Sequence, residues 1–222
     1  VIRVPRRAVP AITPVHYPLL IGAANVAPAL VAGNTVIVKP STETALSMLL
    51  VAKALEKAAL THGELNFVTG RGHENGDTRA KSPLIDMISF TGSTAIGEHI
   101  AKQASMQHLS LELGGKGAAL VLGDANLDLA AKEVARGGLR FQGQRCDAVS
   151  RILVDAKVAD AFVSKLLAEV AKYPMGDTRD EKTAIGPLIT PKAVAYAQEL
   201  VLDARSKGAK LLAGGNALGN YH

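Results

Sequence analysis

Short apolar runs rich in β-branched residues alternate along this chain with longer segments in which apolar positions recur every three or four residues. Runs of the first kind are typical of buried strands, and the second pattern indicates amphipathic helices. Because the two alternate, we expect an α/β fold with a Rossmann-like, doubly wound parallel sheet, the architecture of a nucleotide-binding domain. Strands are predicted at 9–13, 35–39, 65–69, 87–91 and 108–113, and helices at 20–32, 45–60 and 96–103.

A glycine pair, Gly114-Gly115, separates this region from a second α/β segment. The last helix of that segment has clear ends, because Thr190 is a good N-cap, Pro191 suits the first helical position and Gly208 is a typical stop. We therefore predict two domains, 1–114 and 115–222. We expect the first to lack its N-terminal part because the chain starts with Val rather than Met, and the second to lack its C-terminal part because the chain stops abruptly at His222. The other predicted elements are strands at 118–122, 151–154 and 210–213, and helices at 127–140 and 158–173.

Composition narrows the function classes. The 25 basic and 20 acidic residues give a net charge of +5, but the basic residues are scattered. The few aromatic residues do not interleave with them, which argues against nucleic-acid binding. No apolar run approaches the ~20 residues that cross a bilayer. A single cysteine excludes an intramolecular disulfide and fits a reducing, cytoplasmic setting.

That cysteine, Cys146, lies in the polar loop Gly143-Gln144-Arg145-Cys146-Asp147. A lone cysteine in such a protein is more often a small core residue than a nucleophile. The neighbouring cation, however, favours the thiolate, which is the nucleophilic form. A metal site is not expected, because no second cysteine and no histidine pair at ligand spacing accompanies Cys146. The loop therefore makes a nucleophile a serious alternative to a core cysteine.

Glu112 lies at the C-terminal edge of the predicted strand 108–113, next to the glycine pair. Catalytic groups of open α/β sheets gather at that edge. Spacing alone favours an ion pair between Glu112 and Lys116 or another lysine, and a general base is the alternative.

The segment from Phe90 to Gly97 follows another predicted strand and differs from the common G-x-G-x-x-G pattern. Gly92 allows the chain to turn, and Ser93 or Thr94 is a suitable helix cap. The first N–H groups of the helix would then offer donors and positive potential to a pyrophosphate. An ordinary capped turn is the alternative interpretation.

Five motifs in order along the whole chain resemble those of the aldehyde dehydrogenase superfamily. Glu112 and Cys146, 34 residues apart, match its glutamate and cysteine motifs at a family-like interval. The segment 90–97 resembles the glycine motif of its cofactor domain, and 36–41 resembles the segment whose lysine holds the cofactor ribose. Gly176-Asp177 with Gly186-Pro187-Leu188-Ile189 resembles a further stretch of its catalytic domain.

The resemblance implies NAD(P)-dependent oxidation of an aldehyde to a carboxylic acid, within a homodimer or homotetramer when the chain is complete. Cys146 would form a thiohemiacetal and then a thioester, and Glu112 would activate the water that hydrolyses it. It implies a cofactor domain at 1–114 and a catalytic domain at 115–222. The cofactor residues implied are Thr13, Pro14, Lys39, Ser41, Thr42, Thr91, Gly92, Ser93, Gly97, Leu113 and Gly114.

One position departs from the family pattern. The loop 14–18 matches the family segment that normally supplies an asparagine to the oxyanion, but this chain has His16 there. An oxyanion-hole donor typically contributes about 2.7–4 kcal/mol to catalysis. An imidazole N–H is also a donor, so His16 is either a working variant of the catalytic donor or the sign of a weakened enzyme.

Arg145 and Tyr17 resemble residues of the archaeal non-phosphorylating glyceraldehyde-3-phosphate dehydrogenases, which implies that both bind substrate. The implied substrate is a small or phosphorylated aldehyde such as glyceraldehyde 3-phosphate, whose phosphate a planar guanidinium suits. Tuning of the thiol or a surface ion pair is the alternative role for Arg145.

Cofactor choice depends on Thr42, three residues after Lys39. Because Thr42 carries no charge and Lys39 is close, NADP should be tolerated or preferred over NAD. In the alternative interpretation, Thr42 only caps the helix that starts near Thr44.

Two other functions stay open. One is a coenzyme A-acylating semialdehyde dehydrogenase, although members of that kind lack a glutamate at the position of Glu112. The other is a non-catalytic nucleotide-binding fragment, which the substitution at His16 keeps possible.

Overall fold

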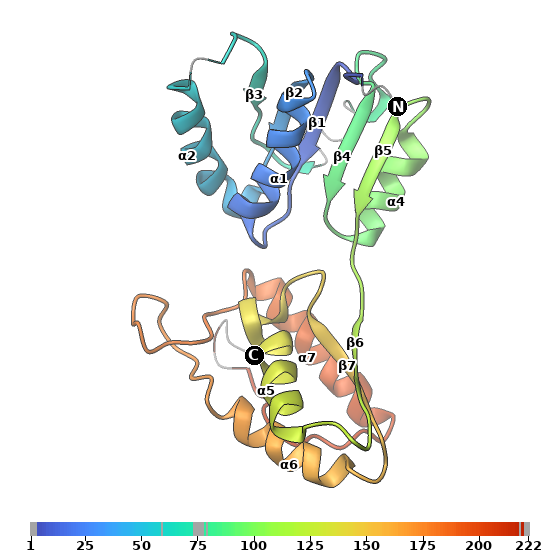
Figure 1. Ribbon diagram of the computed structural model, residues 1–222, viewed down its shortest axis with the longest axis vertical. Helices are drawn as coiled ribbons and strands as arrows, with labels where there is room; N and C mark the ends of the chain where they lie inside the picture. Colours follow the sequence, from blue (N-terminus) through green and yellow to red (C-terminus); the bar gives the residue numbers. More distant parts are fainter. Residues whose placement is uncertain (1–3, 59, 73–77, 79, 218, 220–222) are drawn as a thin grey trace. The chain divides into compact units, whose positions relative to one another are not determined.

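The computed structural model describes residues 4–58, 60–72, 78, 80–217 and 219. The chain forms two compact units, Val1–Gly114 and Gly115–His222, which are traced in blue to green and in green to red in Figure 1. No helix in the described part of the chain combines the length and the apolar character that a bilayer span requires.

The first unit is built on a sheet of five strands in the order β3-β2-β1-β4-β5. Every neighbouring pair is parallel, and the order is that of a doubly wound nucleotide-binding sheet. This confirms the predicted fold class. The strands are β1 (Ala8–Ile12), β2 (Thr35–Lys39), β3 (Leu65–Phe67), β4 (Met87–Thr91) and β5 (His108–Glu112).

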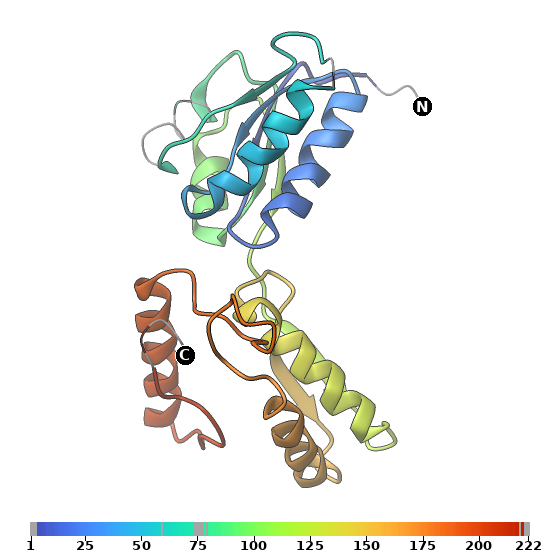
Figure 2. The same ribbon diagram turned by 90° about the vertical axis from the view of Figure 1, so that its left-hand side faces the viewer.

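Helices cover both faces of this sheet (Figure 2). Side chains alternate along β2, so that Val36 and Val38 join one apolar cluster while Ile37 packs against another. The first cluster includes Met48 of α2 (Ala45–Glu56) and Val26 of α1 (Pro18–Val31), and the second includes Ile100 of α4 (Thr94–Gln103). The helix predicted at 45–60 is shorter than expected, because it ends at Glu56 and turns at Lys57.

The central strand β1 contains Pro10, which has no backbone N–H for the ladder. Thr13 N–H donates toward β2, to the Lys39 carbonyl at 3.1 Å. Because successive backbone groups alternate between the two neighbouring strands, the Pro10 nitrogen lies on the β4 side. Pairing with β4 accordingly begins only at Ala11, opposite Ser89. The proline therefore shortens the ladder between β1 and β4 and leaves the ladder between β1 and β2 complete.

The second unit contains two parallel strands, β6 (Gly117–Val121) and β7 (Val149–Val154). Against them pack α5 (Leu127–Leu139) and α6 (Ala159–Val170), with Phe162 in the centre of their apolar cluster. The last helix is α7 (Pro191–Ser206), whose N-cap Thr190 accepts a hydrogen bond from Ala193 N at 3.2 Å, as the sequence predicts. At the start of α5, Asn126 is the N-cap and accepts from Leu129 N at 3.1 Å.

The predicted strand at 210–213 is wrong. These residues follow α7 as irregular chain and pair with neither β6 nor β7. Leu211 and Leu212 are 42% and 50% exposed, so neither belongs to the buried core of this unit. A strand obtains its hydrogen bonds from a neighbouring strand, which a local apolar pattern cannot guarantee.

Candidate functional site

The C-terminal edge of the five-stranded sheet gathers most of the predicted cofactor residues. Because the strands are parallel, the ends of β1, β2 and β4 meet there, and ligands of such sheets bind where the strand order reverses, beside β1 and β4. Thr13, Lys39 and Thr91 lie at these ends and are 4%, 6% and 7% exposed. Backbone bonds hold the edge in register, among them Gly92 N to the Glu112 carbonyl at 3.0 Å.

Two of these buried polar groups differ in their hydrogen bonding. Lys39 Nζ donates to the Pro40 carbonyl at 3.0 Å. The Thr13 hydroxyl has no hydrogen-bond partner among the described residues. Leaving a buried hydroxyl unsatisfied costs about 1–3 kcal/mol, so native proteins rarely keep one without a ligand or water. Thr13 is therefore suited to meet a polar ligand at this edge.

Helix α4 begins at the same edge, directly after β4. Ser93 is its N-cap and accepts from Ile96 N at 3.4 Å, so Ser93 rather than Thr94 is the capping residue. The other first-turn N–H groups remain available to an anion. Gly97 is buried in α4, where an added Cβ would clash with the Leu113 side chain. The glycine lets α4 approach Leu113 and sets the helix start beside the strand ends.

Thr42 lies in a 3-10 turn, Thr42–Thr44, between β2 and α2. Its hydroxyl donates to the Gly70 carbonyl at 3.4 Å. Helix α2 starts at Ala45, and no side chain caps it. The interpretation of Thr42 as a helix cap is therefore wrong, and its role toward the cofactor stays a prediction. Ser41 and Pro14, also predicted to bind cofactor, lie on the loops that follow β2 and β1, where Ser41 is half-buried and Pro14 is buried.

The other predicted site residues of the first unit also lie at or after the C-terminal ends of its strands. Glu112 ends β5 with an exposed side chain, and it forms no ion pair with a described residue of its own unit. Pairing with Lys116, which belongs to the second unit, stays a prediction. His16 is 8% exposed, and its ring meets the Tyr17 ring edge to face with centroids 6.1 Å apart. Tyr17 has a left-handed backbone, φ 45°, where α1 begins.

Cys146 lies in the second unit, on the loop between α5 and β7, and is a free, exposed cysteine. A core position is therefore excluded. The loop starts with three successive left-handed residues, Phe141, Gln142 and Gly143, with φ of 58°, 56° and 68°. For a residue with a side chain this conformation costs roughly 1–2 kcal/mol, so surrounding contacts must stabilise it. Strain of this kind is often found at functional loops.

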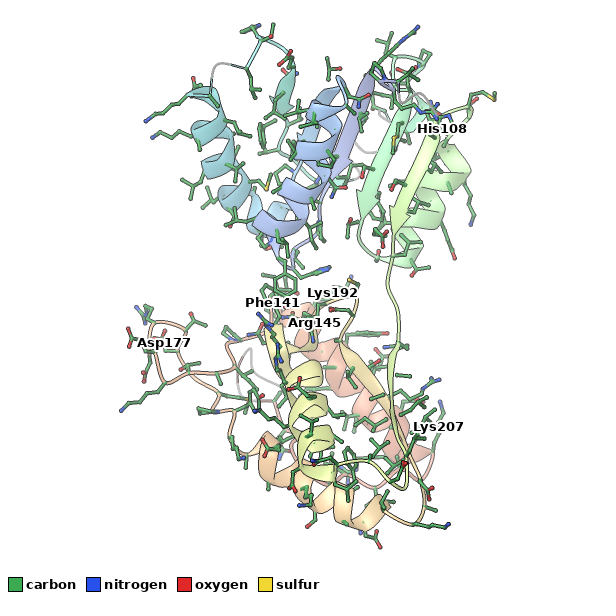
Figure 3. All side chains as sticks on the ribbon, viewed as in Figure 1. His108, Phe141, Arg145, Asp177, Lys192 and Lys207 are labelled. Carbon is green, nitrogen blue, oxygen red and sulfur yellow. The ribbon has the colours of Figure 1, made fainter. Side chains whose placement is uncertain are left out.

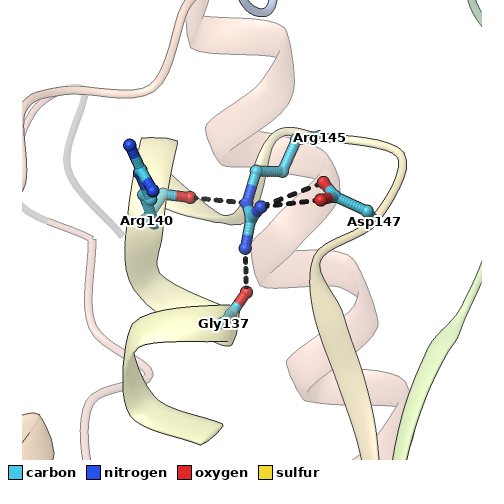
Figure 4. Close-up of polar contacts among 4 residues, drawn as sticks. All are labelled: Gly137, Arg140, Arg145 and Asp147. Carbon is cyan, nitrogen blue, oxygen red and sulfur yellow. Dashed lines mark hydrogen bonds and ion pairs between the residues drawn. The ribbon is translucent and has the colours of Figure 1, made fainter. Parts of the chain in front are cut away.

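Arg145 supplies many of those contacts (Figure 4). Its Nε donates to the Arg140 carbonyl at 3.2 Å and its second terminal nitrogen to the Gly137 carbonyl at 2.5 Å. The remaining nitrogen donates to both carboxylate oxygens of Asp147, each at 3.0 Å. The side chain is only 9% exposed. An ion pair was one of the roles the sequence left open for Arg145, and its substrate-binding role stays a prediction.

A second set of contacts joins this loop to the segment 186–189. Gln144 Oε1 accepts from Ile189 N at 3.0 Å. With its amide turned to satisfy both groups, Gln142 accepts from Gly186 N at 3.1 Å and donates to the Phe141 carbonyl at 3.0 Å. The sequence motifs included the segment 186–189, but no role was predicted for Gln142 or Gln144. The only signal for these two residues was that they flank Gly143.

The other half of that predicted stretch forms an exposed turn. Asp177, labelled in Figure 3, accepts from Arg179 N at 3.0 Å and from the Arg179 guanidinium. The side-chain bond, with a smaller contribution from the backbone bond, lowers the pKa of Asp177, and the same side-chain bond raises the pKa of Arg179. Asp177 thus stabilises its own turn and does not belong to the loop of Cys146.

These arrangements define what the two units can do chemically. The first offers a buried hydroxyl with no partner in the described part of the chain, a buried lysine and the start of a ten-residue helix. All three lie at one sheet edge, and the set fits a dinucleotide. The second presents an accessible thiol on a loop held by side-chain contacts. An accessible thiol on a fixed backbone is what nucleophilic catalysis requires.

Comparison with known proteins gives a family match that spans both units. The model of the aldehyde dehydrogenase family matches residues 1–222. The NADP-dependent glyceraldehyde-3-phosphate dehydrogenase of Streptococcus equinus is 45% identical over 208 residues, which cover 94% of this chain and 44% of that protein. The lactaldehyde dehydrogenase of Methanococcus vannielii is 37% identical over 216 residues, which cover 96% of this chain and 46% of that protein.

Among solved structures, NADP-dependent glyceraldehyde-3-phosphate dehydrogenase from Bacillus halodurans C-125, complexed with NADP, superposes with a TM-score of 0.95 at 42% identity. The match covers 99% of this chain and 46% of that one, so the present chain spans less than half the length of these relatives. With a family match over its full length, the chain belongs to the aldehyde dehydrogenase family.

Proposed function

We propose that the protein carrying this chain oxidises an aldehyde to a carboxylic acid, with Cys146 as nucleophile and NADP as hydride acceptor. The observation that carries the proposal is the exposed thiol of Cys146 on a loop whose flanking side chains are all engaged in contacts. In this proposal residues 1–114 bind the cofactor and residues 115–222 supply the nucleophile. Family membership supports both assignments.

The chemistry assigned to the protein's own residues is as follows. The Cys146 thiolate forms a C–S bond to the aldehyde carbon, and the carbonyl oxygen becomes an oxyanion. The imidazole of His16 donates to that oxygen in place of the amide usual in the family. Bound NADP supplies the acceptor for the hydride of the adduct, which leaves a thioester on Cys146. Glu112 then removes a proton from water, the hydroxide attacks, the C–S bond breaks, and the acid and thiolate are released.

For the cofactor, we propose that Thr13, Lys39 and the start of α4 hold the dinucleotide. The Thr13 hydroxyl, which has no partner among the residues that the structure describes, and the capped, glycine-containing helix support this assignment. NADP is favoured over NAD because Thr42 places no negative charge beside Lys39. The names of the relatives from Streptococcus equinus and Bacillus halodurans, both NADP-dependent, point the same way.

For the substrate, we propose a small polar or phosphorylated aldehyde, with glyceraldehyde 3-phosphate as first candidate. Support comes from the Streptococcus equinus relative, named for that compound, while the Methanococcus vannielii relative is named for lactaldehyde. We also propose that the complete protein is a homodimer or homotetramer, as the family resemblance suggests. We propose a cytoplasmic location because this chain has a single cysteine, which fits a reducing compartment.

Single-turnover kinetics test the proposal. With glyceraldehyde 3-phosphate and NADP, Cys146→Ala should form no NADPH. Glu112→Gln should form about one equivalent of NADPH per active site in a burst and then turn over ~10²–10⁴-fold more slowly than the unsubstituted protein. Glu112→Asp is the control that retains a carboxylate. An unchanged steady-state rate in Glu112→Gln would contradict the assigned role, and a rate that rises with added coenzyme A would instead indicate acyl transfer to that thiol.

A further inference from the structure

The N-terminal edge of the five-stranded sheet, opposite the proposed cofactor edge, carries a hollow of about 550 Å³. Its lining comes from three segments, which are 5–7 before β1, 81–86 before β4 and 105–108 at the start of β5. The volume lies within the range of about 300–1,000 Å³ that is usual for small-molecule sites. Because ligands of open parallel sheets ordinarily bind at the other edge, this hollow is not part of the proposed dinucleotide site.

Cations outnumber carboxylates among the residues that line the hollow. The cations are Arg6, Arg7 and Lys81, whereas the only carboxylate is that of Asp86. Arg6 and Arg7 are both exposed, and neither forms an ion pair with a residue that the structure describes. Guanidinium groups without a carboxylate partner create a positive potential, so the hollow attracts anions.

A contact between Arg6 and His108 crosses the start of β4, which lies between β1 and β5 in the sheet. Arg6 Nη1 lies 2.7 Å from Nε2 of His108, which is labelled in Figure 3 and is paired with Met87 at the start of β4. Since a guanidinium can only donate, Nε2 accepts this bond and the imidazole hydrogen lies on Nδ1. The Arg6 side chain makes no other hydrogen bond to a described residue, so most of its N–H groups can serve a ligand.

Hydrogen bonds within the unit hold the walls of the hollow in place. Gln107 joins two of the three segments, because its side chain accepts from Ser105 N at 2.7 Å and donates to the Ser82 carbonyl at 3.1 Å. Asp86 is tied to the start of β1, where its N–H donates to the Ala8 carbonyl at 3.3 Å and its carboxylate accepts from Ala8 N at 3.4 Å. A site whose walls are already ordered loses little conformational freedom when a ligand binds.

From these observations we propose that the hollow binds a phosphate group, either free or on a small organic monoester. Arg6 and Arg7 bind the phosphate oxygens, because planar guanidinium groups match the geometry of those oxygens. The carbon part of a monoester packs on the apolar part of the lining, which consists of Pro5, Pro83, Ile85 and Met106. No step of the proposed oxidation uses this site, so the proposal does not rest on the proposed function.

Calorimetric titration of the protein that carries this chain tests the proposal. The ligands are inorganic phosphate and glycerol 2-phosphate, and NADP is present at a saturating concentration so that phosphate does not enter the dinucleotide site. We expect saturable binding, and Arg6→Gln and Arg7→Gln should each raise the Kd about tenfold or more, the loss typical of one charge-assisted hydrogen bond. Arg6→Lys should lose less, because it keeps the charge. Arg151→Gln, which removes an exposed arginine from β7, is the matched control and should leave the Kd unchanged.

Hydrogen exchange measures where the phosphate binds. Inorganic phosphate should slow the exchange of backbone amides in residues 5–8 and 105–108 of the unsubstituted protein, and the effect should be absent or much smaller in Arg6→Gln. Circular dichroism shows whether each variant remains folded, and Arg7→Gln provides a second test of the same site.

The outcomes separate this site from others. Phosphate binding that is lost in Arg145→Gln but unchanged in Arg6→Gln and Arg7→Gln would overturn the proposal in favour of the loop of Cys146. A protein that shows no saturable phosphate binding in the millimolar range would overturn it as well. With binding at the hollow, a lower Kd for glycerol 2-phosphate than for inorganic phosphate would identify a monoester as the ligand, and a Kd that is no lower would identify free phosphate. If the protein oxidises no aldehyde, the proposed function fails, while the titration still tests the hollow.

Discussion

Gln144 and Ile189 lie 45 residues apart in the chain, yet the Gln144 side-chain oxygen accepts a hydrogen bond from the Ile189 backbone N–H at 3.0 Å. The bond joins the loop of Cys146 to a segment that lies just before α7. It satisfies a backbone donor that belongs to neither a helix nor a strand. Together with the contacts of Arg145, this bond holds the Cys146 loop at two points.

Replacing Gln144 should loosen the segment 186–189 as well as the cysteine loop. We expect Gln144→Ala to lower the free energy of unfolding by about 0.5–1.5 kcal/mol, the usual net value of one hydrogen bond. Exchange of the Ile189 amide with solvent should become faster, measured by hydrogen–deuterium exchange. Gln198→Ala, on the exposed surface of α7, serves as the control. Unaltered protection of Ile189 would show that the bond does not form in solution.

Arg7 offers a test of backbone strain at the N-terminal edge of the sheet. Its φ is 67°, although it is not a glycine, and its carbonyl accepts from Thr35 N at 2.7 Å, which fixes this conformation before β1. The left-handed conformation costs roughly 1–2 kcal/mol, whereas glycine's extra entropy costs roughly 0.5–1 kcal/mol. Arg7→Gly should therefore raise the free energy of unfolding by about 0.5–1 kcal/mol in urea titrations.

Arg7→Ala separates strain from the loss of the side chain, because alanine keeps the Cβ that causes the strain. We expect no gain in stability from Arg7→Ala. Equal effects of the two substitutions would refute strain as the cause.

The fold was largely predictable because its signals are local. Runs such as Thr35–Lys39 and Met87–Thr91 are apolar, rich in β-branched residues and closed by Pro40 or Gly92, and both strands have the predicted ends. Helix α7 was equally clear from its N-cap and proline. The wrong strand at 210–213 had a local pattern of the same kind, but strand formation depends on a partner, which local pattern does not reveal.

The site was predictable in its residue types but not in its contacts. Family-like motifs identified the cysteine loop, and the exposed thiol agrees with an accessible nucleophile. The left-handed turn at Phe141 and Gln142 carried no local signal, because neither residue favours that conformation. The bond from Ile189 to Gln144 joins distant parts of the chain, so only the tertiary structure reveals it.

The carboxyl group of Asp177 should titrate below its ordinary pKa. The hydrogen bond from the Arg179 side chain lowers the pKa of Asp177, so the turn's stabilisation is fully present above the unfolded-state pKa of about 3.9. It is lost as pH falls through the lower, folded-state pKa. The carboxyl carbon resonance of Asp177 should show a midpoint that rises toward the ordinary value in Arg179→Ala. Equal midpoints in the two proteins would contradict the assigned cause.

A substitution at Thr42 should change the preference between NADP and NAD if the dinucleotide binds beside Lys39 as proposed. Thr42 lies on the turn after β2, three residues from the buried Lys39, and its only described hydrogen bond is a 3.4 Å contact to the Gly70 carbonyl. Thr42→Glu would place a carboxylate where it repels a 2′-phosphate and accepts from a ribose hydroxyl. We expect the Kd for NADP to rise about tenfold or more, equivalent to 1.4 kcal/mol per tenfold, with NAD binding unchanged or tighter.

Thr42→Gln is the matched control, since it has nearly the same size as glutamate without the charge. Isothermal titration of both cofactors against both variants separates charge repulsion from steric exclusion, because only repulsion should weaken with added salt. If Thr42→Gln weakened NADP as much as Thr42→Glu, bulk rather than charge would be responsible. If neither variant altered the ratio of the two affinities, residue 42 would lie outside the ribose site, and the preference for NADP would have to come from other residues.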